Sequence, residues 1–139
     1  MLFTKQDKPA SYAIRFLTDS PWSHVAAQLK DGSIVDTTFT YDGVRRWSVD
    51  AWSSIYKEVE TREFVLPDEQ KAEQWALQQL GKPYDWLGVI GLGLRKRKWH
   101  DESAWFCSEM KAAMAMVGGR MLVRLDAKKV TPRDLWIAV

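Results

Sequence analysis

Short stretches of clustered or alternating apolar residues run through the first half of the chain and are typical of β-strands. Residues 12–17 (Tyr-Ala-Ile-Arg-Phe-Leu) are rich in aromatic and β-branched side chains, which predicts a strand. Residues 23–29 and 33–39 predict two more strands, and residues 59–66 predict a fourth. We therefore expect the first half of the chain to supply most of a sheet.

The second and third of these strands are joined by Lys30-Asp31-Gly32, which is typical of a hairpin with a type I turn and a left-handed glycine. A three-residue loop places Ala26 opposite Asp36 and His24 opposite Thr38, so that His24 and Asp36 share a face. A two-residue turn would put these two side chains on opposite faces. The other face is expected to be the core face and carries Val25, Ala27, Leu29, Val35 and Phe39.

The second half of the chain has the spacing of helices. Residues 67–80 open with Pro-Asp, carry alanine and tryptophan on one side and are followed by Gly81, which predicts a helix that stops there. Residues 107–117 predict a second helix, ended by two glycines. Residues 121–125 predict a strand, and residues 130–136 begin with a threonine cap and a proline, which predicts a short final helix or turn.

Length and composition favour one globular domain, residues 1–139, with 46% hydrophobic and 27% charged residues. The longest apolar stretch, residues 86–94, is far shorter than the roughly 20 residues that a membrane span needs. No apolar signal region follows the first residue, so we expect a protein that is cytoplasmic when made. The glycines at 88, 91 and 93 do not form a dinucleotide-binding fingerprint, and no cofactor is expected.

The net charge of the chain argues against nucleic acids as partners. Twenty basic and 18 acidic residues give a net charge of +2, which excludes a broad nucleic-acid footprint. The one basic run, Arg95-Lys96-Arg97-Lys98, is either a solvated loop or a contact for an anionic polymer such as that of the cell wall.

The only cysteine of the chain, Cys107, stands where the second predicted helix begins. Unpaired N–H groups and the helix dipole at this end favour the thiolate and lower a thiol pKa below about 8.5. A lone cysteine among apolar residues can also be an inert part of the core. A single cysteine rules out an intramolecular disulfide and a paired-cysteine zinc site, and no metal is expected.

A cysteine nucleophile needs a nearby base, and the base needs a third group that fixes its tautomer. The chain has two histidines. His100 lies in the basic segment beside two acidic residues and is expected to be a solvated loop residue. His24 lies in a predicted strand on the face that it shares with Asp36, which makes it the candidate base for Cys107.

Five motifs follow one another in an order that resembles a known family: Ser23-His24-Val25-Ala26, Asp-Gly-Ser-Ile-Val-Asp at 31–36, Leu-Gly-Lys-Pro-Tyr-Asp at 80–85, Phe106-Cys107-Ser108-Glu109, and Val-Thr-Pro-Arg-Asp-Leu at 130–135. This order is similar to that of the circularly permuted NlpC-type branch of the papain-like cysteine hydrolases, in which the histidine hairpin precedes the cysteine helix. The likeness covers residues 12–136.

The resemblance implies a fold and four site residues. The fold is a small α+β domain in which an antiparallel sheet packs against the helix that carries the cysteine. Cys107 would be the nucleophile, His24 the general base and acid, and Asp36 the residue that orients the histidine. Tyr84 would line the cleft and help the Cys107 N–H to bind the developing oxyanion, or it would be a turn tyrosine that packs on the core.

The resemblance also implies an activity, hydrolysis of an amide bond in bacterial cell-wall peptides through an acyl-enzyme. Two alternatives stay open: a lipid acyltransferase or phospholipase of the same fold, and a papain-like domain that binds without catalysis. A cell-wall enzyme without a signal peptide would need lysis, a phage particle or a secretion apparatus to reach its substrate.

Overall fold

A computed structural model of the chain describes residues 1–93, 103–124 and 126–139. The strands in this part of the chain are β1 Leu2–Lys5, β2 His24–Gln28, β3 Ile34–Thr38, β4 Gly43–Trp47 and β5 Glu58–Thr61. The helices are α1 Pro9–Thr18, α2 Val49–Ile55, α3 Glu69–Gln78, α4 Trp86–Gly93, α5 Cys107–Val117 and α6 Pro132–Ala138, with a 3-10 turn at Ala127–Lys129. The expectation of an α+β domain with an antiparallel sheet is confirmed.

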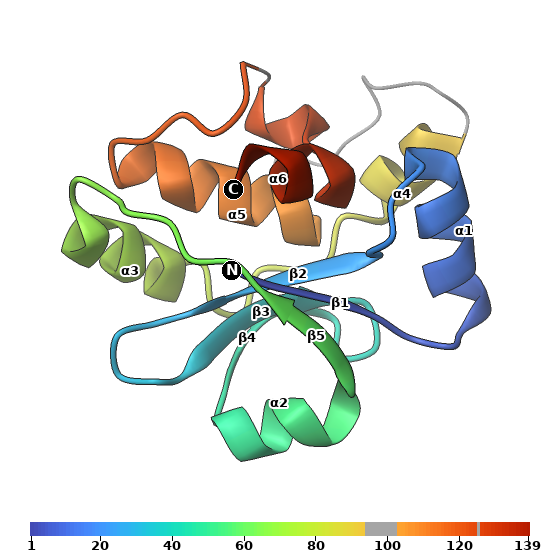
Figure 1. Cartoon of the computed structure of the whole chain (residues 1–139), viewed down its shortest axis with the longest axis horizontal. Helices are drawn as coiled ribbons and strands as arrows, with labels where there is room; N and C mark the ends of the chain where they lie inside the picture. The colour runs from blue at the N-terminus through green and yellow to red at the C-terminus, as the bar shows by residue number, and fades with distance from the viewer. Residues whose placement is uncertain (94–102, 125) are drawn as a thin grey trace.

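The five strands form one sheet in the order β4-β3-β2-β1-β5, and every neighbouring pair is antiparallel. Figure 1 shows α3, α5 and α6 on one side of the sheet and α2 on the other. The sheet therefore has a buried face on each side.

The two faces have separate apolar clusters. Val35 of β3 and Ala27 of β2 pack with Ala72 and Ala76 of α3 and with Met110 of α5. The opposite face packs against α2 and its C-terminal end through Leu2, Ala26, Ile34, Trp52 and Tyr56. This second cluster explains why the face that carries Asp36 is also removed from water.

The predicted hairpin register is confirmed. Ala27 pairs with Val35 and Gln28 pairs with Ile34, which is the register that a three-residue loop requires. Gly32 has φ +85°, and its N–H donates to the Leu29 carbonyl at 3.0 Å. The core-face expectation holds for Val25, Ala27, Leu29 and Val35. It is wrong for Phe39, which is 52% exposed because β3 ends at Thr38.

The strand predicted at residues 12–17 is wrong. These residues belong to α1, in which Pro9 occupies the first turn and the left-handed Asp19 ends the helix. Ser11, Ile14 and Thr18 face inward at helical spacing. The prediction used the aromatic and β-branched content of the segment and overlooked this spacing. The first strand is instead β1, which lies between β2 and β5.

The later elements follow the predictions more closely. Asp68 caps α3, which ends at Gln78, and α5 spans Cys107–Val117 as expected. Thr131 caps α6, with Pro132 in its first turn. The strand predicted at 59–66 is reduced to Glu58–Thr61. Residues 121–124 form no strand, because they run past the helices and away from both edges of the sheet, and Leu125 lies outside the described residues.

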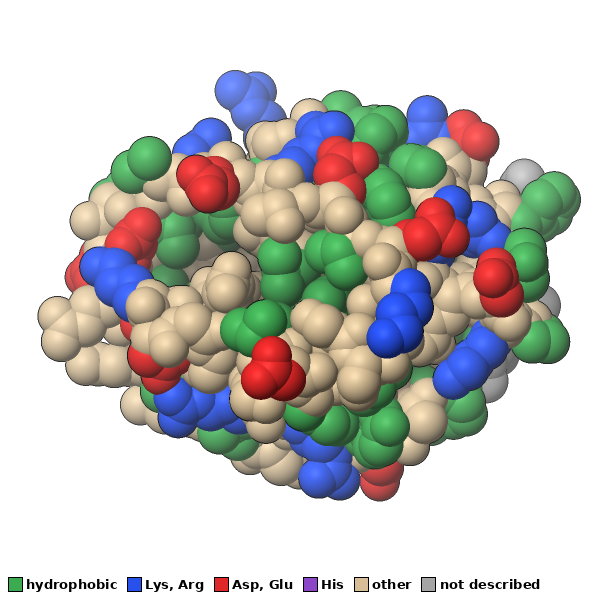
Figure 2. Space-filling model, turned by 60° about the horizontal axis from the view of Figure 1, so that its bottom comes forward, with side chains coloured by type: hydrophobic (Ala, Val, Ile, Leu, Met, Phe, Trp, Pro, Cys, Tyr) green, Lys and Arg blue, Asp and Glu red, His purple; other side chains and the backbone are tan. Residues whose placement is uncertain are grey.

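The surface carries mixed charge. On the face shown in Figure 2, basic and acidic side chains alternate with apolar ones, and neither sign gathers into a large patch. Within the described part of the chain, no helix combines the length and apolarity needed to cross a membrane.

Candidate active site

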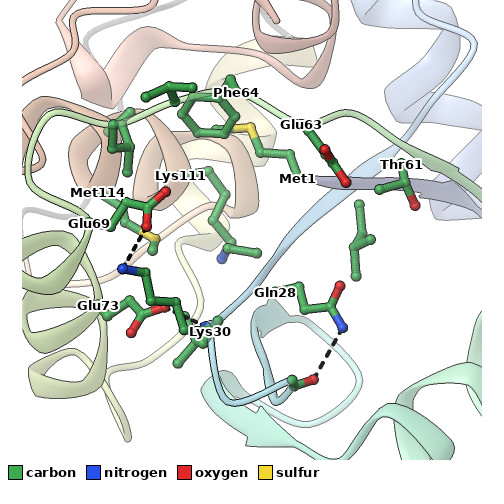
Figure 3. A pocket seen from close by; sticks show the side chains of 17 residues that line it. Met1, Gln28, Lys30, Thr61, Glu63, Phe64, Glu69, Glu73, Lys111 and Met114 are labelled. Carbon is green, nitrogen blue, oxygen red and sulfur yellow. Dashed lines mark hydrogen bonds and ion pairs between the residues drawn. The ribbon is translucent and has the colours of Figure 1, made fainter.

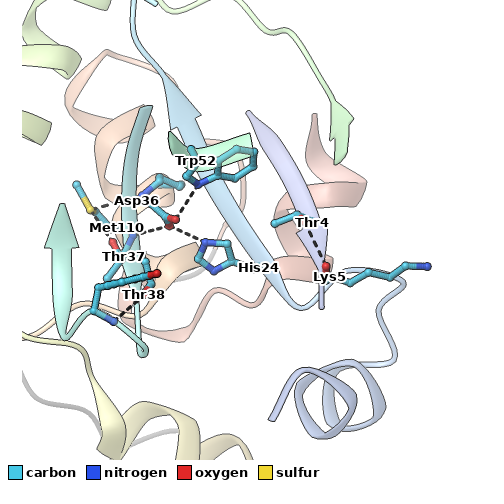
Figure 4. A network of polar contacts seen from close by, with 10 residues as sticks. Thr4, Lys5, His24, Asp36, Thr37, Thr38, Trp52 and Met110 are labelled. Carbon is cyan, nitrogen blue, oxygen red and sulfur yellow. Dashed lines mark hydrogen bonds and ion pairs between the residues drawn. The ribbon is translucent and has the colours of Figure 1, made fainter. Parts of the chain in front are cut away.

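The candidate histidine and carboxylate meet across the hairpin. His24 is the first residue of β2 and Asp36 lies in the middle of β3. Their side chains share a face, and Nε2 of His24 lies 2.5 Å from Oδ1 of Asp36. Only 12% of the histidine side chain is exposed, and none of the aspartate (Figure 4).

Asp36 is held by more than the histidine. Its Oδ1 accepts the N–H of Thr37 at 2.7 Å, and its Oδ2 accepts Nε1 of Trp52 at 2.9 Å. Burial alone would raise the pKa of Asp36. The charge of His24 and its hydrogen bond outweigh burial, with help from Lys111, and the pKa of Asp36 is lowered. Asp36 is therefore ionised, and the hydrogen bonds that both carboxylate oxygens accept fix the orientation of its side chain.

His24 is fixed in orientation by Asp36 and by Tyr56. Its ring stacks on that of Tyr56, with centroids 5.2 Å apart and planes 8° from parallel. Burial lowers the pKa of His24, but the charges of Asp36 and Cys107 and hydrogen bonds to both raise it to about 10. Because Asp36 binds Nε2, the other ring nitrogen is left for the thiol.

Cys107 is the first residue of α5, and its side chain is fully buried. Two contacts fix this end of the helix. Glu109 accepts the N–H of Phe106 at 3.2 Å, and the Ser108 hydroxyl donates to the Val130 carbonyl at 2.5 Å. The N–H of Cys107 points out of the first turn, where no intrahelical acceptor exists. This N–H group can therefore donate a hydrogen bond to an oxyanion that forms next to the sulfur.

Tyr84 lies beside this helix start. Its backbone bridges to Trp105, and its ring packs with Val25, Phe106 and Cys107. Burial first, and then the nearby Cys107 and Asp36, raise the pKa of Tyr84 well above its usual range. Its hydroxyl is therefore a neutral donor.

A cavity of about 420 Å³ opens in front of these side chains. His24, Tyr56 and Tyr84 form its inner wall, and α1 and the segment after β3 form the sides through Lys8, Pro9, Ser11, Ile14, Phe39 and Thr40. Cys107 does not contribute to the described wall. The cavity therefore borders the histidine and the tyrosine, whereas Cys107 is fully buried.

The structure brings together four of the residues selected from the sequence, Cys107, His24, Asp36 and Tyr84. His100 and the basic run Arg95–Lys98 lie outside the described residues. Among the residues that are described, no group of three or more His, Cys, Asp and Glu side chains is arranged to hold a metal ion.

Sequence reasoning missed Trp52 and Tyr56, the two aromatic residues of the site that come from α2 and its end. The available signal was Ser48, whose hydroxyl caps α2 by accepting the N–H of Ala51 at 3.3 Å. A serine cap at this position starts a helix that carries Trp52 toward the sheet.

Comparison of the chain with protein-family models, curated proteins and solved structures gave no match. The function is therefore inferred from the chemistry and geometry of the site.

Proposed function

We propose that this protein is a thiol hydrolase of the permuted NlpC-like, papain-like type, which cleaves an amide bond in peptidoglycan stem peptides. The observation that carries the proposal is the arrangement of His24, which hydrogen-bonds Asp36 through Nε2 and also engages the side chain of Cys107. A base that is fixed by a buried carboxylate and joined to a thiol at a helix start is the arrangement that nucleophilic catalysis needs.

The proposed reaction has two steps. The Cys107 thiolate attacks the carbonyl carbon while His24 gives its proton to the leaving amine, which leaves a thioester on Cys107. His24 then takes a proton from water, the resulting hydroxide attacks the thioester, and the carboxylic acid departs as the thiolate is restored. The Cys107 N–H and the Tyr84 hydroxyl would stabilise the oxyanion in both steps.

The test is cleavage of purified muropeptides by the full chain, with the new free amine and any thioester on Cys107 detected by mass spectrometry. Cys107→Ala and His24→Ala should each abolish turnover, and the double variant should be little worse than either, because the pair acts as a unit. His100→Ala is expected to retain activity and serves as the histidine control. Turnover that survives Cys107→Ala would exclude this mechanism.

A second candidate is acyl transfer or hydrolysis on a lipid by the same residues. The cavity is bordered by Phe39, whose ring meets Trp86 edge-on at 4.0 Å, and both side chains are about half exposed. On the neighbouring α1, Tyr12, Phe16 and Leu17 are exposed as well. Such an apolar rim suits an acyl chain. Released fatty acid from phospholipid vesicles without muropeptide cleavage would favour this candidate, and neither product would favour a binding domain without catalysis.

A further inference from the structure

One buried charge is not used by the proposed reaction. Lys111 follows Cys107 by one turn of α5, so the two side chains lie on the same side of the helix. None of its surface is exposed, although lysine is almost never fully buried without a partner. Among the described residues it forms no ion pair, and its Nζ contacts the sulfur of Met110 at 3.6 Å.

The nearest cavity does not neutralise this lysine. Lys111 lines a cavity of about 670 Å³ between α5, α3 and β2, shown in Figure 3. Three carboxylates lie at its border. Glu69 pairs with Nζ of Lys30 at 2.8 Å, Glu73 accepts the Lys30 N–H at 2.6 Å, and the charge of Glu63 acts on the N-terminal ammonium group of Met1. Because the lysine has no accessible surface, a ligand in this cavity would not reach its ammonium group.

The anionic groups that act on Lys111 belong to the candidate active site. Burial lowers the pKa of Lys111 below its ordinary range, and the charges of Asp36 and Cys107 limit that lowering. A polar route also joins the two regions, because Met110 accepts the Thr37 hydroxyl at 3.0 Å and the Thr37 N–H binds Asp36 (Figure 4).

Without Lys111, the charges of the site do not sum to zero. The charges of a Cys107 thiolate and a His24 imidazolium would cancel, and a neutral amide in place of Asp36 would leave that sum at zero. Asp36 adds a negative charge in a buried setting, where an unbalanced charge is costly. We propose that Lys111 is a positioning residue that balances Asp36, so that Cys107 can ionise while Asp36 stays ionised. This inference rests on the proposed function, since it assumes a reactive thiolate.

Other ionisable groups face the same region and must stay unchanged in a test. At the candidate site they are His24, Tyr56, Tyr84 and Glu109. At the border of the cavity they are Lys30, Glu63, Glu69 and Glu73. The substitution Lys111→Met removes the charge while it keeps a long side chain in an apolar setting. Removing one of two balancing buried charges leaves the other uncompensated, so the variant should be less stable than the parent, and the titration is done well below its melting temperature.

The experiment is a pH titration of the Cys107 thiolate by ultraviolet absorbance in the full chain, which has no other cysteine. Lys111→Met should raise the midpoint by about one unit or more, and slow iodoacetamide labelling about tenfold below that midpoint. Lys57→Met, at an exposed lysine that bonds the Ser53 carbonyl, should leave the midpoint unchanged. The melting temperature of Lys111→Met should lie below that of the parent, because the buried carboxylate of Asp36 loses the charge that balances it.

Two further variants separate charge from packing. Lys111→Arg, which keeps the charge, should retain the parent midpoint, and Asp36→Asn combined with Lys111→Met should return the midpoint toward it. An unchanged midpoint in Lys111→Met beside a lowered one in the parent overturns this inference and leaves the proposed function standing. A rise that the double variant does not reverse also overturns it. An ordinary midpoint in the parent itself, about 8.5 or higher, overturns the proposed function.

Discussion

Nε2 of His24 lies 2.5 Å from Oδ1 of Asp36, and this contact joins the first residue of β2 to the middle of β3. The carboxylate also accepts Trp52 Nε1 and the Thr37 N–H, so it cannot rotate away from the histidine without losing both bonds. Asp36 therefore fixes the orientation of the His24 ring, whose other nitrogen engages Cys107.

Trp52→Phe should weaken both the fold and the site. The substitution keeps an aromatic ring but leaves Oδ2 of Asp36, which is fully buried, without its donor. We expect a loss of roughly 1–3 kcal/mol in the free energy of unfolding, measured by denaturant titration, and a lower kcat. The control is Trp47→Phe, because Nε1 of Trp47 is buried without a hydrogen-bond partner among the described residues. Equal losses in the two variants would contradict the assigned role of Trp52.

The His24–Asp36 pair should make stability depend on pH in a defined direction. The pKa of His24 in the fold, about 10, lies above its ordinary value of 6.5. The stability that His24 adds is therefore fully present below about pH 6.5 and is lost as the pH rises through about 10. The lowered pKa of Asp36 adds stability above pH 3.8 that is lost on acidification. The difference in unfolding free energy between the parent and His24→Ala should shrink as the pH rises from about 6.5 to about 10. A difference that stays constant would exclude the raised pKa.

Tyr84→Phe should separate catalysis from packing. If the hydroxyl binds the oxyanion, its removal should lower kcat on the order of 100-fold while KM and the melting temperature change little. Tyr56→Phe is the matched control, because this residue also lines the cavity and its ring would still stack on His24. A kcat for Tyr84→Phe that matches the parent would show that the tyrosine is a packing residue.

Gly43→Ala should disturb the segment that leads to Tyr84. Gly43 has φ +112°, and a Cβ there would lie 2.0 Å from the Lys82 carbonyl oxygen, which accepts the Val44 N–H at 2.9 Å. We expect a larger loss of stability than in Gly32→Ala, where φ is +85° but the space is open and the cost is about 1–2 kcal/mol. Activity should fall only in Gly43→Ala, since Gly32 lies in the hairpin loop. Thermal unfolding and turnover of both variants test this.

The part of the site that was predictable from sequence depends on local geometry. A three-residue loop ending in Gly32 fixes the register of the hairpin, and the register alone puts His24 and Asp36 on one face. Cys107 was predictable for a similar reason, because the apolar approach and the helix after it place the residue at a helix start. Both inferences use residues that are close in sequence.

The rest depends on contacts that local patterns do not contain. Trp52 reaches Asp36 because α2 crosses the second face of the sheet, and its burial could not be inferred from its own segment. Aromatic and β-branched content suggested a strand at residues 12–17, where Pro9 and tertiary packing instead favour α1. β1 was missed because four residues show too little alternation to be read as a central strand.

The order of the elements along the chain has a consequence for biosynthesis. All five strands lie within residues 2–61, and β1 is flanked by β2 and β5. On the ribosome, the sheet that holds His24 and Asp36 can pair before Cys107 has been translated. Cys107, the proposed nucleophile, then reaches His24, its proposed base, on a helix that is made late, so a nascent chain would carry no activated thiol until the domain is nearly complete.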